Sequence, residues 1–240
     1  MSLPEAPSPD RWRATIAEVA AGSEPTARLL TPLARTGSLA VLPGAYNPPT
    51  RAHLTLAESA RARGFEAVLF SLGTVTVDKP ESGLRLEERI QLLVEIAREA
   101  GFGVVLVNRG LYAEQAEALR RSLHDMERMA FVIGMDKVEQ IFDRRYYADR
   151  DRSLGALFER AELLVAARGD LDQPALARLL EEPTARAYAH RIGWLDLDPR
   201  VREVSSSAVR ERLARGESAS EFLPPAVDRY LRGRAEVFRK

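Results

Sequence analysis

The sequence predicts an α/β fold, a doubly wound parallel sheet of about five strands with helices on both faces. Two observations lead to it. From residue 38 onward, short apolar runs alternate with amphipathic segments of helical period. The apolar runs are uninterrupted, which is typical of strands in a parallel sheet with both faces covered. In such sheets ligands bind beyond the carboxyl ends of the strands, where the strand order reverses, so functional motifs should gather there.

Residues 1–37 differ in composition, and we expect them to form an N-terminal extension with a flexible start and two short helices. Three prolines fall within the first nine residues. Trp12, Ile16 and Val19 are spaced as on one face of a helix, and the leucines of residues 29–33 suggest a second helix ending at Gly37. We interpret the segment as an extension that packs on the main domain. The alternatives are a lid, or a contact between copies in a homo-oligomer.

Residues 38–240 are expected to form the main domain with a C-terminal helical part. After the first strand, the period changes to that of a helix at Leu54, and helices are also predicted over 84–100, over 113–123 and from Ala208. Together these elements describe a Rossmann-like domain. The predicted strands are residues 39–42, 67–70, 104–107, 129–133 and 163–166.

Composition narrows the class of protein. Lys and Arg together number 35, as do Asp and Glu, and this balance argues against a dedicated nucleic-acid binder. With no cysteine, disulfides and thiolate metal sites are excluded. No apolar run approaches the ~18 residues of a membrane span, and residues 1–7 lack the features of a signal peptide. We therefore expect a cytoplasmic protein with no membrane or nucleic-acid partner.

The most informative segment is residues 44–53, GAYNPPTRAH, between the first strand and the first helix of the main domain. Such a junction suits an anion, because free N–H groups and the helix dipole point at the loop. Gly44 allows close approach of the backbone, and the two prolines at 48 and 49 fix the loop. Thr50 and His53 are three residues apart and should share a helix face, where both could donate to phosphate oxygens.

A second motif lies far downstream, in residues 204–210, VSSSAVR. The serine run before an amphipathic stretch predicts the N-cap of a helix. Hydroxyl and N–H groups at this helix start, with Arg210 one turn further on, would also make an anion clamp.

Together the two motifs resemble the signatures of the nucleotidyltransferase superfamily, G-x-[FY]-[DN]-P-x-[HT]-x-x-H and I-S-S-T-x-x-R. Three further stretches resemble the nicotinate- and nicotinamide-mononucleotide adenylyltransferases in particular. These are residues 131–136, FVIGMD; residues 164–169, LVAARG; and residues 221–231, EFLPPAVDRYL. The resemblance covers about residues 38–235.

The resemblance implies transfer of AMP from ATP to a pyridine mononucleotide, with release of pyrophosphate, as in NAD biosynthesis. It also implies Mg²⁺, held mainly by the ATP phosphates, and no dedicated metal ligands in the protein. It assigns His53, Thr50 and Arg210 to catalysis. By the same resemblance, ATP would be bound by Gly44, Ala45, Tyr46, His53, Gly134, Asp136, Ser206, Ser207 and Arg210, and the acceptor by Asn47, Lys79, Arg168 and Tyr146.

The sequence departs from the family pattern at several positions. Thr50 stands where many bacterial members have His, Ala52 where Gly is common, and Val204 and Ser207 replace Ile and Thr. Two alternatives follow: another transferase of the superfamily, such as one acting on phosphopantetheine, or a nucleotide-binding protein without catalysis. Whether the acceptor carries nicotinate or nicotinamide is left open.

Overall fold

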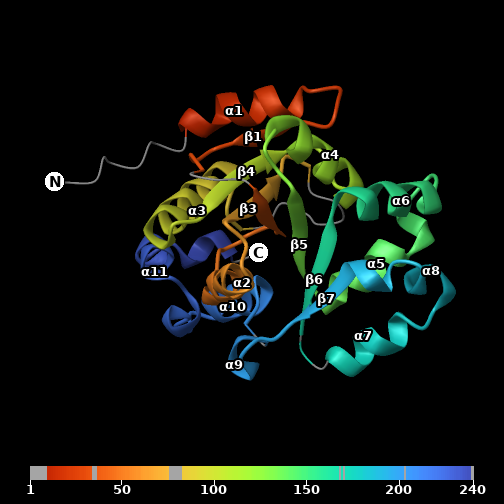
Figure 1. Cartoon of the computed structure of the whole chain (residues 1–240). Helices are drawn as coiled ribbons and strands as arrows, with labels where there is room; N and C mark the ends of the chain where they lie inside the picture. Colours follow the sequence, from red (N-terminus) through yellow and green to blue (C-terminus); the bar gives the residue numbers. More distant parts are fainter. Residues whose placement is uncertain are drawn as a thin grey trace.

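The computed structural model describes residues 10–33, 37–75, 83–167, 169, 171–202 and 204–238. Within them, one sheet has the strand order β1-β4-β3-β2-β5-β6-β7 (Figure 1). Neighbouring strands from β4 to β7 are parallel, and β1 pairs antiparallel with β4. The strands are β1 (Ala27–Leu29), β2 (Ser38–Pro43), β3 (Ala67–Gly73), β4 (Gly103–Val107), β5 (Arg128–Gly134), β6 (Glu162–Ala166) and β7 (Ile192–Leu195).

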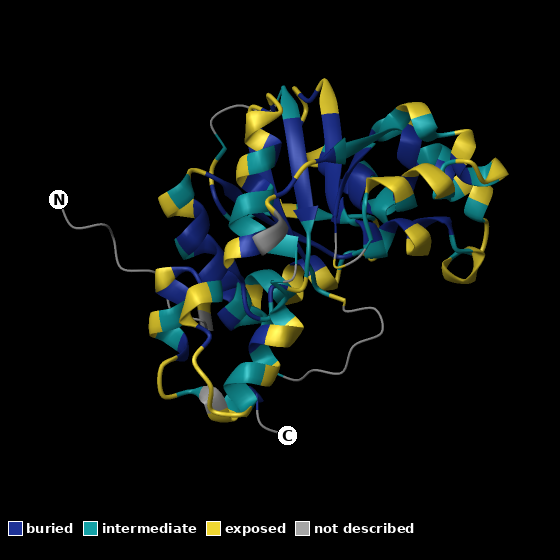
Figure 2. Cartoon of the chain, turned by 90° about the horizontal axis from the view of Figure 1, so that it is seen from below, coloured by how far each residue is buried: buried dark blue, intermediate teal, exposed yellow. Residues whose placement is uncertain are grey.

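Helices cover both faces of the sheet, because side chains alternate along each strand and feed two separate cores. Residues on one face of β2, such as Ala40 and Leu42, pack with α1 (Asp10–Ala20), α2 (Arg51–Ala62), α3 (Leu86–Ala100), α10 (Ser206–Ala214) and α11 (Pro225–Leu231). Residues on the other face, such as Leu39 and Val41, pack with α4 (Tyr112–Ser122), α5 (Met135–Phe142), α6 (Arg150–Arg160), α7 (Gln173–Leu179) and α8 (Pro183–Arg186). Figure 2 shows the buried strands between helices whose outer faces are exposed.

Short elements complete the described chain: α9 (Pro199–Arg202) and 3₁₀ turns at Arg144–Tyr146, Ala189–Arg191, Ser220–Phe222 and Ala235–Phe238. Helix α3 illustrates how the sequence sets the boundaries. Its apolar residues lie on one buried face, and Gly101 ends it in the left-handed conformation at φ 69°, where glycine carries no steric penalty. No helix among the described residues is both long enough and apolar enough to span a membrane.

The predicted fold class is confirmed, and the strand count is corrected from about five to seven. The extra parallel strand is β7, which contains Trp194. The extra antiparallel strand is β1, and it overturns the second N-terminal helix expected near residues 29–33. Only three residues long, β1 carries no period of its own, and its register with β4, Ala27 opposite Val107, is set by contacts far along the chain.

The first turn of α3 contains a buried carboxylate that holds the C-terminal segment. Oε1 of Glu88 accepts hydrogen bonds from the Tyr230 hydroxyl (2.7 Å) and from the Arg234 guanidinium (3.0 Å), and Oε2 accepts one from the Arg85 N–H (2.9 Å). Burial alone would raise the pKa of the Glu88 carboxyl. The hydrogen bonds from Tyr230 and the Arg85 backbone, with the charges of Arg234 and Arg85, outweigh burial and lower the pKa.

We predict that Glu88→Gln lowers the free energy of unfolding by about 2 kcal/mol at pH 7, because buried charge-assisted hydrogen bonds are lost. Since the folded-state pKa is lowered, this stabilisation is present above the unfolded-state pKa of about 4.3 and disappears as pH falls through the folded-state pKa. Urea denaturation of both proteins across this range measures the difference.

Glu95→Gln on the same helix is the matched control. Glu95 pairs with Arg229 at 3.6 Å near the surface, and such exposed pairs contribute about 0–1 kcal/mol. A difference between wild type and Glu88→Gln that stays constant from pH 7 into acid would contradict the assignment.

Candidate active site

A cavity of about 800 Å³ opens beyond the carboxyl ends of the parallel strands. Its walls come from Leu42 and Pro43 at the end of β2, Ile133 and Gly134 at the end of β5, and Ala166 at the end of β6. Strand β2 lies between β3 and β5, which is where the direction of strand order changes. The cavity therefore occupies the position in which sheets of this type bind ligands.

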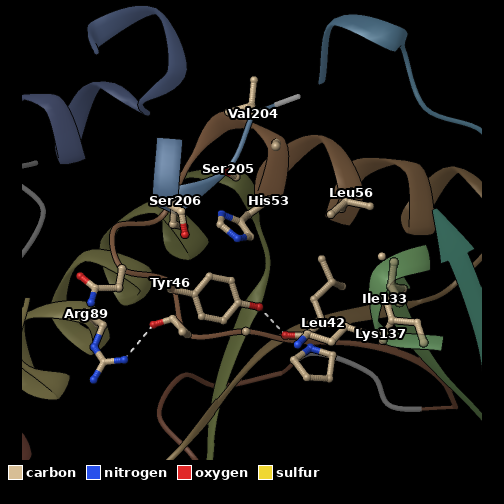
Figure 3. A pocket seen from close by; sticks show the side chains of 18 of the residues that line it. Leu42, Tyr46, His53, Leu56, Arg89, Ile133, Lys137, Val204, Ser205 and Ser206 are labelled. Carbon is tan, nitrogen blue, oxygen red and sulfur yellow. Dashed lines mark hydrogen bonds between the residues drawn. The ribbon is translucent and has the colours of Figure 1, made fainter. Parts of the chain in front are cut away.

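His53 lies on the cavity wall in a fixed orientation (Figure 3). The Thr50 N–H donates to Nδ1 of His53 at 2.9 Å, and the Thr50 hydroxyl lies at the same distance from that nitrogen. Because Nδ1 accepts, the neutral ring carries its proton on Nε2. This arrangement makes Nε2 a hydrogen-bond donor, which suits a phosphate oxygen.

The buried side chain of Tyr46 packs beneath the loop after β2 and holds its conformation. Its side chain is buried, its hydroxyl donates to the Leu42 carbonyl, and its backbone is left-handed at φ 49°. The ring packs 4.8 Å from the His53 ring, centroid to centroid, and a Cβ on Gly44 would lie only 2.8 Å from the Tyr46 ring carbon Cζ. Gly44 is therefore required by the tyrosine ring folded over it. Burial raises the pKa of the Tyr46 phenol, which stays a neutral donor.

Side chains from two later helices hold the carbonyl groups of this loop. Arg89 of α3 donates to the Ala45 carbonyl at 3.0 Å, as drawn in Figure 3. From α10, Arg210 donates to the Asn47 carbonyl at 2.7 Å, and Ser206 to the Pro48 carbonyl at 2.8 Å. The carbonyl oxygens are thus engaged by protein donors, which fixes the orientation of the peptide groups before any ligand arrives.

The serine run begins α10, as the sequence predicts. Ser205 is the N-cap, and its hydroxyl accepts a hydrogen bond from the Ala208 N–H at 3.0 Å. Ser206 and Ser207 occupy the first turn and line the cavity, and Arg210 donates to the Ser207 hydroxyl at 3.1 Å. Arg210 uses two of its nitrogens in this way, while its guanidinium has five N–H donors in all.

The cavity is basic although the whole chain has a formal net charge of zero. Among the described residues that line it, two are acidic, Glu87 and Asp136, and the cations outnumber them. Such a lining favours ligands that carry phosphate groups. The described residues contain no group of three or more His, Asp or Glu side chains able to hold a metal ion. The cationic residues are Arg85, Arg89, Lys137, Arg202 and Arg210.

The structure brings most of the sequence-predicted site residues together. Two are placed elsewhere. Thr50 is fully buried and is not among the described residues that line the cavity; it contacts Nδ1 of His53, and its catalytic role stays a prediction. Tyr146 is exposed beyond α5 and is not among the described residues that line the cavity, so its role in binding the acceptor stays a prediction. The residues brought together are Gly44, Ala45, Tyr46, Asn47, His53, Gly134, Asp136, Ser206, Ser207 and Arg210.

Asn47 has a structural contact as well. Its Oδ1 accepts from the Leu84 N–H at 2.9 Å and so ties the loop to the segment before α3. Lys79 and Arg168, both predicted to bind the acceptor, lie outside the described residues.

Sequence reasoning left several cavity residues unassigned. Arg85 and Arg89 received no role from the sequence, although their spacing of four at a helix start places them on one face of that helix. Lys137 directly follows Asp136, which was predicted to bind ATP, and Arg202 precedes the serine motif by two residues. Their closeness to these motifs was the one feature of the sequence that could have indicated them. Nothing in the sequence indicated Ile16, which reaches the cavity from α1.

The chain is similar to known proteins over most of its length. Relatives in Geobacter sp. (strain M21) and Pelobacter propionicus, each named "Probable nicotinate-nucleotide adenylyltransferase", are 26% and 28% identical, and each alignment covers 81% of this chain and 95% of the relative. A solved structure of similar fold is Plasmodium falciparum nicotinic acid mononucleotide adenylyltransferase complexed with APC. Its TM-score is 0.60 at 12% identity, with 85% of this chain and 98% of that chain covered.

The sequence profile of the cytidylyltransferase-like family matches residues 41–212. That range holds the loop after β2, His53, the end of β5 and the serine motif of α10, which are the parts that build the cavity. The chain belongs to the cytidylyltransferase-like family of nucleotidyltransferases.

Proposed function

We propose that this protein transfers the adenylyl group of ATP to nicotinate mononucleotide and so forms a pyridine dinucleotide. The observation that carries the proposal is the basic cavity in which a loop of fixed peptide groups, the His53 donor and the α10 N-terminus converge. The names of the curated relatives support nicotinate as the base of the acceptor. The excess of cations on the cavity wall also suits an acceptor with an additional carboxylate.

In the proposed reaction, a 5′-phosphate oxygen of the acceptor attacks the α-phosphorus of ATP. A new P–O bond forms, the bond to the oxygen bridging to the β-phosphorus breaks, and pyrophosphate leaves with the electron pair. The nucleophile arrives already ionised, so the protein needs no general base. Its contribution is to position two anions against each other and to stabilise the negative charge that develops.

We assign the roles by position. His53 donates from Nε2 to the phosphate chain of ATP, and Ser206, Ser207 and Arg210 hold the β- and γ-phosphates. Thr50 positions His53.

The rest of the cavity divides on either side of β2. Gly134 at the end of β5 and Asp136 in the first turn of α5 hold the nucleoside of ATP. The acceptor then occupies the opposite half, toward α3, where Arg85 and Arg89 lie.

Mg²⁺ enters in this proposal as part of the substrate. It keeps most of its water and is commonly bound through phosphates and only one or two carboxylates. Asp136 lies on the cavity wall. Glu87, the second carboxylate there, is engaged by Arg13 at 3.2 Å. The lining therefore suits a triphosphate that brings its own cation.

The proposal predicts pyrophosphate release from ATP and Mg²⁺ when nicotinate mononucleotide is added. Pyrophosphate is measured with a coupled assay, and nicotinamide mononucleotide and phosphopantetheine are compared as acceptors. CTP replaces ATP in a parallel series, because the family profile bears the name of cytidylyl transfer. We expect turnover with ATP and nicotinate mononucleotide that exceeds every other combination.

Each of the other possible results would assign a different activity to this protein. Turnover with phosphopantetheine alone would replace the acceptor, and turnover with CTP alone would replace the donor. ATP binding without turnover on any of the three acceptors would contradict the proposed reaction and support a nucleotide-binding protein without catalysis.

His53→Ala is expected to lower kcat by about 10²-fold or more, because loss of one preorganised donor to a developing charge typically has that effect. Thr50→Val tests the positioning role, since it removes the hydroxyl and keeps the backbone N–H that holds Nδ1. We expect it to lower kcat by less than about tenfold.

Steady-state kinetics of both variants check these values, and His190→Ala, an exposed histidine outside the cavity, is the matched control. If His53→Ala kept kcat within threefold of wild type, the assignment of His53 to the phosphates would be wrong.

A further inference from the structure

Helix α1 forms part of the cavity wall although it lies outside the family profile. The profile begins at residue 41, whereas α1 spans Asp10–Ala20. Ile16 of α1 nevertheless lines the cavity, and it packs against the same core as β2 and α3. The cavity is therefore completed by a segment that the shared family domain does not supply.

Helix α1 is firmly docked on α3. Trp12 is buried, and its indole Nε1 donates to Oε1 of the buried Gln91 at 3.0 Å. One residue further on, Arg13 donates to Glu87 at 3.2 Å, and Glu87 itself lines the cavity. These contacts, one of them buried, set the position and rotation of α1 and hence the direction of Ile16, four residues after Trp12.

The chain after α1 is fixed as well, so the helix is held at both ends. The Asn108 side chain, just beyond β4, accepts from the Thr26 N–H at 2.8 Å and donates to the carbonyls of Gly22 and Glu24 at 2.9 Å. Strand β1 then pairs with β4. In Figure 1, α1 accordingly runs along the outside of the β1–β4 side of the molecule.

This side of the sheet is the half assigned to the acceptor. Strands β3, β4 and β1 lie on one side of β2, together with α3 and α1, and β5, β6 and β7 lie on the other. Ile16 therefore lies away from Gly134 and the end of β6. Two apolar residues at the start of α3, Leu84 and Leu86, also line the cavity, one on each side of Arg85 in the sequence.

We propose that Ile16 is a specificity-determining residue that contacts the acceptor mononucleotide and limits the size of acceptor that fits. The inference rests on the proposed function, because that function divides the cavity into an ATP half and an acceptor half. An apolar side chain in a cavity that guanidinium groups also line suits a flat ring carried on a phosphorylated sugar. The N-terminal segment is, in this view, a part of the substrate site.

Two substitutions at Ile16 test the contact. Ile16→Ala removes it, and we expect KM and Kd for nicotinate mononucleotide to rise about tenfold, the lower end of the effect of a lost apolar contact in a pocket. Ile16→Trp fills the space proposed for the acceptor and should raise KM and Kd for nicotinate mononucleotide by at least about tenfold. Neither change should alter KM for ATP by more than about twofold. Turnover gives KM, and calorimetric titration of the 240-residue chain gives Kd.

Val19→Ala is the matched control. Val19 is buried on the same helix, yet it is not among the described residues that line the cavity. It should lower Tm without moving KM for the acceptor by more than about twofold. The Tm of each Ile16 variant is also measured. It separates destabilisation of α1 from loss of the contact between Ile16 and the acceptor.

The two proposals fail in different ways. Unchanged acceptor KM and Kd in both Ile16 variants, with an active wild type, would overturn the role of Ile16 alone. A change in KM for ATP equal to that for the acceptor, or the same effect from Val19→Ala, would also overturn it. A wild type that binds nicotinate mononucleotide without releasing pyrophosphate would overturn the proposed reaction, and weaker binding by Ile16→Ala would still support the contact. No binding to wild type would overturn both.

Discussion

The first turn of α3 is the constraint on which the rest of the site depends. Three consecutive residues there, Glu87, Glu88 and Arg89, are about 100° apart around the helix axis and so reach in three directions. Glu87 engages Arg13 of α1, Glu88 engages the C-terminal segment, and Arg89 holds the Ala45 carbonyl. One helical turn thus connects the N-terminal segment, the C-terminal segment and the loop after β2, which are far apart in the sequence.

These connections explain how the loop after β2 can be rigid enough for the anion site that we propose there. A loop needs partners for its carbonyl groups, and unpaired ones cost free energy when they are shielded from water. Here α3 and α10 supply those partners, so the helices that present Arg89 and Arg210 also fix the peptide groups between Ala45 and Pro48. In the proposed function, the same guanidinium groups combine a structural role with a ligand-binding role, because they hold a loop whose peptide groups are already fixed.

The sequence allowed prediction of the features with a strong local signal. Apolar runs predicted five of the parallel strands, and the serine N-cap was correct because capping is a local interaction. Strand β1 was missed because three residues paired at a distance leave no period. The positions of Thr50 and Tyr146 relative to the cavity were equally hidden: burial of Thr50 and exposure of Tyr146 are set by packing, which spacing along the chain does not encode.

The net charge of the chain likewise does not show where its charged side chains lie. Equal numbers of acidic and basic residues predict nothing about an anion site, since many of these charges are paired on the outer surface, as Arg128 is with Glu162. What matters is that cations from α3, α5, α9 and α10 meet at one edge of the sheet, where two carboxylates oppose them and one of these is already paired with Arg13. Since Arg13 belongs to α1, the N-terminal segment contributes to the positive character of the cavity by neutralising Glu87. The local potential of the cavity therefore depends in part on a contact made from outside the family domain.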